Sequence, residues 1–261
     1  MMPASAGMVM QRMTGNPMAS PEVLGVSAGG GVGLAAFLIV GGASGAVLLG
    51  GMAIGSLAGL AVMLSVAARS GFGPERLLLA GIACGTFCMA ILSTVLSSGG
   101  MAAYLLLVWM SGSTNSVGAF EAWTAVLSAM VLIAPLFALT RWLDVLPLGS
   151  AASRGLGVPV IRARLVLSVL AALLTAAASF AIGPLSLVGL MAPHLARLIG
   201  FMKVPQQLAA PLFIGASVLI LADWLARLVV FPYQVPTGLF AALIGAPYLI
   251  WLLHRGGPVR D

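Results

Sequence analysis

The sequence predicts an all-α polytopic membrane protein, a bundle of about eight transmembrane helices preceded by a partial helix at the N-terminus. Hydrophobic residues make up 61% of the 261 residues and charged residues only 7%. A soluble domain is about half apolar and about a quarter charged. The mean hydropathy is +1.14. Uncharged apolar runs long enough to cross a bilayer recur along the chain, which places it in the membrane.

The first half of the chain holds four predicted spans, each marked by a run without charged residues. The run from Val23 to Ala68 is long enough for two spans, and the pair Gly41-Gly42 breaks it. The run from Leu77 to Phe120 holds one span followed by an uncharged polar stretch, and a further span lies between Ala122 and Thr140. Because about 20 apolar residues cross a bilayer, each segment is long enough.

The second half holds four more predicted helices. The run from Leu165 to Ala196 holds a full span, after which Gly183-Pro184 breaks the helix and a shorter helix follows. The residues from Gln206 to Ala222 open the next span, and the last lies between Leu228 and His254. The apolar residues 1–10 are about half of what a span needs, so they predict only a partial helix.

Basic residues orient these spans. If the loop between residues 141 and 164 is cytoplasmic, counting spans outward places nearly all of the 12 lysines and arginines inside. The inner ones are Arg12, Arg69, Arg76, Arg141, Arg154, Arg162, Arg164, Arg197, Lys203, Arg255 and Arg260. Only Arg227 lies outside, which is the positive-inside pattern of membrane proteins. The net charge of +6 therefore reflects membrane topology and does not indicate a nucleic-acid partner.

The chain carries no motif that would energise transport by itself. A Walker A motif needs Gly-Lys-Ser/Thr, whereas the single lysine, Lys203, lies between Met202 and Val204. Ion-coupled carriers place acidic residues at mid-membrane. The nearest candidate, Asp223, lies near the outer end of its span, with Arg227 four residues on. An ion-coupled secondary transporter or a channel remains the alternative class.

An intramembrane serine protease is a third, weaker hypothesis. Gly42-Ala43-Ser44-Gly45 matches a G-x-S-G pattern, and His194 would be the base. The predicted topology separates them, with Ser44 in an outer loop and His194 in the inner half of another span. No acidic residue, cysteine or second histidine accompanies His194 at ligand spacing. We therefore expect no metal, no cofactor and no catalytic residue.

The loop at residues 143–164 is the most informative cytoplasmic feature. It contains LPLGSAASRGLGV, in which Pro147 and the later Pro159 bracket a short helix that Gly155 and Gly157 end. Its small residues would let a partner surface come close. The pattern predicts a docking element for a cytosolic motor, and a plain connecting loop with arginines is the alternative.

Five longer motifs follow one another along almost the whole chain. They are NPMASPEVLGVSAG at 16–29, ERLLLAGIACG at 75–85, LPLGSAASRGLGV at 146–158, GPLSLVGLMAPHLARLIG at 183–200 and LADWLARLVVFPYQVPTGLFAALIGAPYLIWLL at 221–253. Together they resemble the iron–siderophore and vitamin B12 permease family of ABC importers, and the first and last are most similar to its ferric hydroxamate branch. The resemblance, from about Gln11 to Arg255, implies a permease subunit of an ATP-driven importer for an iron(III)–siderophore complex in the bacterial inner membrane.

The resemblance also implies partners and a coupling site. In the family, the loop at 146–158 sits in a cleft of the ATP-binding subunit. The matching residues are Leu148, Gly149, Ala152, Arg154, Gly155, Leu156 and Gly157. The implied partners are cytosolic ATP-binding subunits, a periplasmic substrate-binding protein, a second permease unit and the lipid bilayer.

Two further sites follow from the resemblance. The cytoplasmic gate comprises Asn16, Pro17 and Met18 together with Pro74 and Glu75. At the last two positions this chain has proline and glutamate where the family has small hydroxyl residues. Arg227 matches the outer arginine that docks an acidic lobe of the binding protein.

The chain departs from the family in its extent. Family members have ten spans per unit, and the motif at 16–29 normally follows the second span. Residues 1–261 then form a single permease domain that lacks the first span and most of the second. The ferric hydroxamate branch fuses two such units in one chain, and one unit is present here. A fragment, a mis-called start and a split gene all stay open. We expect residues 1–20 to be poorly fixed, and the chain not to transport alone.

Overall fold

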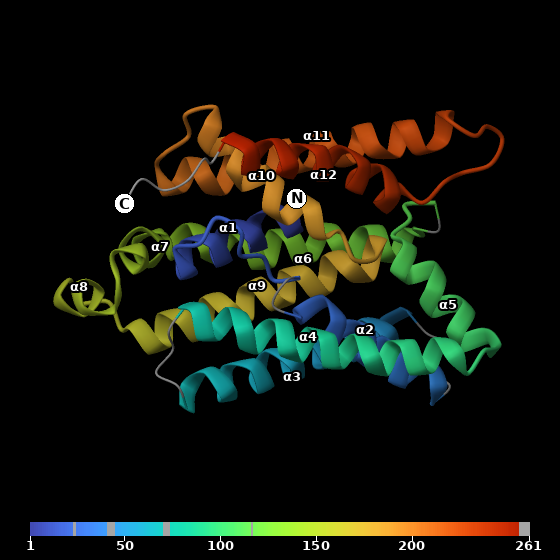
Figure 1. The fold of residues 1–261 in the computed structure, drawn as a ribbon, viewed down its shortest axis with the longest axis horizontal. Coiled ribbons are helices and arrows are strands. Elements are labelled where there is room, and N and C mark those ends of the chain that lie inside the picture. Colours follow the sequence, from blue (N-terminus) through green and yellow to red (C-terminus); the bar gives the residue numbers. More distant parts are fainter. Residues whose placement is uncertain (23–24, 41–44, 70–73, 116, 256–261) are drawn as a thin grey trace.

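The computed structural model describes residues 1–22, 25–40, 45–69, 74–115 and 117–255, and every regular element within them is helical (Figure 1). The elements are α1 (Met2–Thr14), α2 (Val26–Ile39), α3 (Gly45–Arg69), α4 (Pro74–Ser97), α5 (Gly100–Ser111), α6 (Ala119–Ala138), α7 (Thr140–Val145), the 3-10 helix η1 (Leu146–Leu148), α8 (Ser150–Gly155), α9 (Val160–Ile182), α10 (Ser186–Leu198), α11 (Val204–Leu228) and α12 (Thr237–Arg255). The all-α fold class is confirmed.

Five helices in the described part of the chain are long and apolar enough to cross a bilayer, namely α3, α4, α6, α9 and α11. The helices α2, α5, α10 and α12 contain shorter apolar stretches. The predicted break at Gly183-Pro184 falls between α9 and α10. Short helices are tolerated at membrane depth because surrounding protein encloses their ends. The structure therefore supports a multi-pass membrane bundle that mixes long and short helices.

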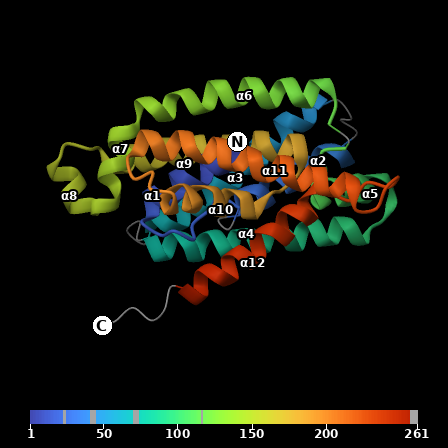
Figure 2. The same ribbon diagram turned by 90° about the horizontal axis from the view of Figure 1, so that it is seen from above.

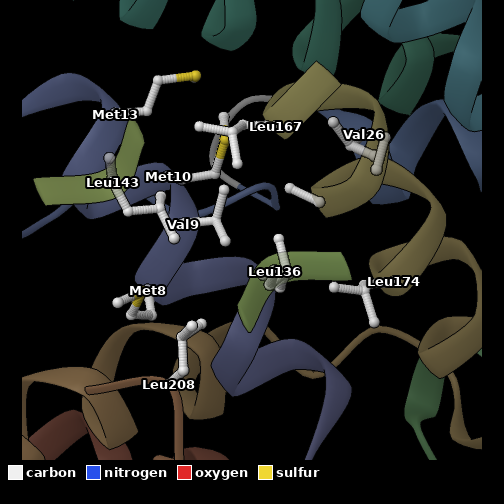
Figure 3. Packing of buried hydrophobic residues seen from close by; sticks show 14 of the residues in the cluster. Met8, Val9, Met10, Met13, Val26, Leu136, Leu143, Leu167, Leu174 and Leu208 are labelled. Carbon is white, nitrogen blue, oxygen red and sulfur yellow. The ribbon is translucent and has the colours of Figure 1, made fainter. Parts of the chain in front are cut away.

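The partial helix at the N-terminus lies in the middle of the bundle. Figures 1 and 2 show α1 surrounded by other helices, and it contacts α9, α10 and α11. Its residues Ala4, Ala6 and Val9 are fully buried. Met8, Val9 and Met10 pack into the main apolar cluster, as Figure 3 shows. The expectation that residues 1–20 are poorly fixed is wrong for this helix, because α9, α10 and α11 enclose it.

Polar contacts also fix α1 at its C-terminal end. The Gln11 amide donates to the Leu190 carbonyl at 3.3 Å, and its oxygen accepts from the Arg197 guanidinium. Arg12 Nε donates to Gln207 Oε1 at 3.0 Å. These contacts join α1 to α10 and α11, and they set both its depth and its rotation in the bundle.

Glycines allow the closest approaches between helices. A Cβ built at Gly33 would lie 2.0 Å from the Gly51 carbonyl oxygen, and one at Gly55 would lie 2.3 Å from the Gly29 oxygen. The backbones of α2 and α3 are therefore in direct contact, which the small residues at four-residue spacing predict. A Cβ at Gly7 would likewise lie 1.8 Å from the Gly189 oxygen, so α1 meets α10 in the same way.

This packing makes a prediction about stability. Replacing Gly33 with alanine forces a methyl group into the α3 backbone, and overpacking of this kind costs about 1–3 kcal/mol. The matched control is Gly50→Ala on α3, because a Cβ there meets no atom within 4 Å. In mild detergent, the free energy of unfolding should fall clearly in Gly33→Ala and change little in Gly50→Ala. Equal stability of the two variants would contradict the packing.

Candidate functional sites

The predicted coupling loop forms a small knob at one end of the bundle. The knob comprises α7, η1 and α8; α8 projects beyond the long helices in Figures 1 and 2, and α7 packs against α1, α6 and α11. Leu143, Leu146 and Val158 are buried at its base. The fully buried Ser153 hydroxyl lies 3.0 Å from the Val145 oxygen and 2.7 Å from the Gly149 oxygen, within donating distance of both. The knob is thus a packed unit rather than a loose loop.

The outer surface of the knob carries every residue predicted to couple to a motor. Leu148 is 62% exposed and Leu156 is 50% exposed. The other five are exposed as well, namely Gly149, Ala152, Arg154, Gly155 and Gly157. The structure therefore brings these residues together on one accessible surface, and their coupling role stays a prediction.

A basic groove of about 500 Å³ runs beside α8. Arg154, Arg162 and Arg164 line it together with Ser150 and Pro159. Arg154 Nε donates to the Ser150 carbonyl at 3.1 Å, which holds the side chain along its own helix. The knob consequently presents positive charge on its flank and apolar leucines on its outer surface.

The first half of the predicted gate is a tight turn after α1. Asn16 Oδ1 accepts a hydrogen bond from the Met18 amide at 2.9 Å, and the Ala19 amide donates to the Asn16 carbonyl at 3.1 Å. Pro17 and Met18 are exposed, whereas Ala19 is fully buried.

The second half of the predicted gate begins α4. Pro74 and Glu75 belong to its first turn, and their side chains lie outside the described part of the structure. The two halves of the gate therefore stay a prediction.

The predicted docking arginine lies at the opposite end of the bundle from the knob. Arg227 Nε donates to Asp223 Oδ2 at 2.9 Å, and the Arg227 side chain is 46% exposed. Asp223 Oδ1 accepts from the Thr114 hydroxyl and, at 3.4 Å, from the Thr237 hydroxyl. Asp223 thus ties α11 to the segment after α5 and to the start of α12, and Arg227 is the outermost member of the cluster.

A cavity of about 390 Å³ lies between α2, α4 and α5. Ile82, Thr86 and Met89 of α4 line it and are exposed on the outside of this chain, so the cavity is open along α4. Trp109 of α5 forms the facing wall, and its indole N–H donates to the Ser179 carbonyl at 2.6 Å. The lining is mainly apolar.

Sequence reasoning missed one charged residue on this cavity wall. Glu22 lies in the turn between α1 and α2, and its Oε1 accepts a hydrogen bond from the Leu185 amide at 3.2 Å. The preceding residues Ser20 and Pro21 are buried, so this part of the turn lies within the bundle. Glu22 directly precedes the uncharged run from Val23, so it lies at the edge of a predicted span and not inside one.

The residues of the protease hypothesis are not brought together by any described contact. Ser44 lies outside the described residues. The His194 ring packs against Tyr248, with ring centroids 6.1 Å apart, and neither ring nitrogen has a hydrogen-bond partner among the described residues. The His194 ring thus links α10 to α12 through its contact with Tyr248.

Comparison with known proteins identifies the family. The model of the FecCD transport family matches residues 3–255. The chain belongs to the FecCD transport family. Its members are transport proteins, which agrees with a bundle of long apolar helices.

Relatives from several bacteria resemble the chain. The iron(3+)-hydroxamate import system permease protein FhuB is 46% identical in Salmonella typhimurium and 43% identical in Escherichia coli, over 97% of this chain. The chain spans only 37–38% of the length of those two proteins. The vitamin B12 import system permease protein BtuC of Escherichia coli O157:H7 is 34% identical, with 97% of this chain and 78% of BtuC covered.

Solved structures share the fold. An inward-facing conformation of a metal-chelate type ABC transporter matches with a TM-score of 0.88 at 24% identity, covering 97% of this chain and 81% of that one. PsaBC from Streptococcus pneumoniae matches with a TM-score of 0.68 at 14% identity, covering 96% and 86%. At these identities the likeness extends to the fold alone.

The cluster around Asp223 and Arg227 yields a prediction that separates docking from stability. Removing the exposed Arg227 side chain by Arg227→Ala should change the melting temperature in detergent little, because exposed ion pairs contribute little. Asp223→Ala should lower stability by about 0.5–1.5 kcal/mol for each hydrogen bond lost with the threonines. If Arg227→Ala proves as destabilising as Asp223→Ala, Arg227 serves mainly to neutralise Asp223.

Proposed function

We propose that the chain is a permease subunit of an ATP-driven importer that carries an iron(III)–hydroxamate complex across the bacterial inner membrane. The observation that carries this proposal is the likeness to two FhuB permeases along 97% of the chain. Its partners would be cytosolic ATP-binding subunits, a periplasmic substrate-binding protein and a second permease unit.

The energy source must lie on a partner. The chain has a single lysine, Lys203, which lies in no phosphate-binding motif. The knob offers a packed base and an exposed outer surface, which suits rigid docking to a motor. An ATP-binding subunit that moves on nucleotide binding would push the knob, and α6 and α9, which flank it in the chain, would carry the motion into the bundle.

The open cavity supports a second permease unit. Ile82 and Met89 are each 43% exposed although they line the cavity beside α4. A second unit placed against α4 would supply the missing wall and enclose a route for the substrate. At the outer end, Arg227 would meet an acidic residue of the binding protein.

Transport in liposomes tests the function. The chain would be reconstituted with its second permease unit, the ATP-binding subunits and the binding protein. We expect uptake of radiolabelled iron(III) trihydroxamate that requires ATP and is unaffected when proton and sodium gradients are collapsed. Uptake that follows an ion gradient and ignores ATP would instead establish the secondary carrier.

Docking of the knob gives a second prediction. A Cβ at Gly155 meets no atom within 4 Å, so Gly155→Trp should not disturb this chain. It should block the partner surface, and each 1.4 kcal/mol of lost docking free energy lowers assembly about ten-fold. Gly155→Ala is the matched control and should transport normally. Normal ATP-dependent uptake by Gly155→Trp, at equal expression, would rule out docking through this surface.

A further inference from the structure

The Glu22 carboxylate is the one charged group on the wall of the cavity among the described residues that line it. Around it lie apolar side chains such as Ile82, Met89 and Leu92. Its one described hydrogen bond comes from the Leu185 amide at 3.2 Å. No lysine or arginine lines the cavity in the described part of the chain, so no cation there balances this carboxylate.

A structural role accounts for part of this arrangement. Leu185 precedes α10, and a carboxylate at a helix N-terminus is stabilised by the free amides and by the helix dipole. Glu121 does the same at α6, where its Oε2 accepts from the Gly118 amide at 3.0 Å, yet that site is exposed. Capping therefore explains an acid beside α10, and it does not explain a carboxylate that also faces an apolar cavity.

Burying a charged carboxylate in apolar surroundings costs free energy. A charged group in apolar surroundings inside a membrane protein is costly unless something compensates it, and such groups commonly mark substrate or ion pathways. A single amide hydrogen bond leaves most of the acceptor capacity of a carboxylate unused. The unused capacity is available to a hydrogen-bond donor or a positive charge that enters the cavity.

We propose that Glu22 contacts the substrate and selects it by charge, which rests on the proposed function. Three hydroxamate groups carry one negative charge each, so they neutralise iron(III), and a protonated amine elsewhere makes the complex cationic. A carboxylate in the cavity attracts such a cationic complex, and it places no electrostatic barrier in the way of a neutral one. It repels a chelate with surplus carboxylates or catecholates, because like charges in a mainly apolar cavity are poorly screened.

A charge-matched pair of substrates tests the proposal. Two iron(III) trihydroxamates with the same frame would be compared, one ending in an ammonium group and the other in a carboxylate. Initial uptake of each is measured in the reconstituted transporter at pH 8, which favours the ionised glutamate. Hydrogen bonds to charged groups are strong enough that Glu22→Gln should lower the cation-to-anion uptake ratio about ten-fold. Glutamine keeps an oxygen to accept from the Leu185 amide.

The control and a second variant keep the test decisive. Glu121→Gln removes a capping carboxylate outside the cavity and should leave the ratio unchanged. Thr86→Lys places a cation on the cavity wall, and it should lower the ratio in the same direction even if Glu22→Gln does not fold.

The outcomes separate this inference from the proposed function. If the wild-type transporter takes up neither complex, the proposed function fails. If it takes up iron hydroxamates but the ratio in a folded Glu22→Gln transporter equals that of wild type, the charge selection fails and Glu22 is a helix cap alone. An unchanged ratio in Thr86→Lys likewise contradicts the proposal, because the cavity is then off the route of the substrate. A ratio that falls in both variants and not in Glu121→Gln supports the proposal.

Discussion

Direct contact between glycine backbones is the constraint on which the rest of this structure depends. Inside a bilayer, lipid tails are as apolar as leucine, so helices associate through close packing rather than through the hydrophobic effect. The contacts of Gly33 with Gly51 and of Gly7 with Gly189 let α2 meet α3 and α1 meet α10 without side chains between them. Short helices that could not cross a bilayer alone are thereby held inside the bundle.

The same constraint places the cavity and its carboxylate. Gly25 begins α2 with a φ of +75°, a conformation that favours glycine, and a Cβ there would lie 2.7 Å from the Gly85 Cα. The start of α2 is therefore pressed against α4, and the turn that carries Glu22 ends at this contact. Gly85 and Thr86 of α4 line the cavity opposite. Backbone packing thus determines where a charged group can face the proposed route of the substrate.

Features that depend on local sequence could be predicted, and those that depend on distant partners could not. Gly183-Pro184 ends α9 by local geometry, and proline and glycine mark out the loop between residues 146 and 158 for the same reason. The enclosure of α1 depends on α9, α10 and α11, which are distant in the sequence. Its ten or so apolar residues alone therefore predict only a partial, poorly fixed helix.

The short helices and the cavity also divide into features that local sequence predicts and features that depend on distant segments. The helix α5 begins at Gly100 directly after Gly99, and the positive φ values of both glycines turn the chain there. Composition alone merged this helix with the span before it. Glu22 resembled an ordinary loop acid because nothing in its neighbourhood predicts that it contacts Leu185 or that Gly25 packs against α4. The gate residues and Arg227 were placed through family resemblance, and the structure adds the partners of Asn16 and Arg227.

The central claim is that the cavity beside α4 lies on the route of the substrate. A single cysteine at Thr86, in a chain whose Cys84 and Cys88 are replaced by alanine, reports on this directly. In the complete transporter, its reaction with a water-soluble maleimide should slow when iron(III) trihydroxamate, binding protein and ATP are supplied together. A reaction rate that stays the same while the substrate is being transported would contradict the claim.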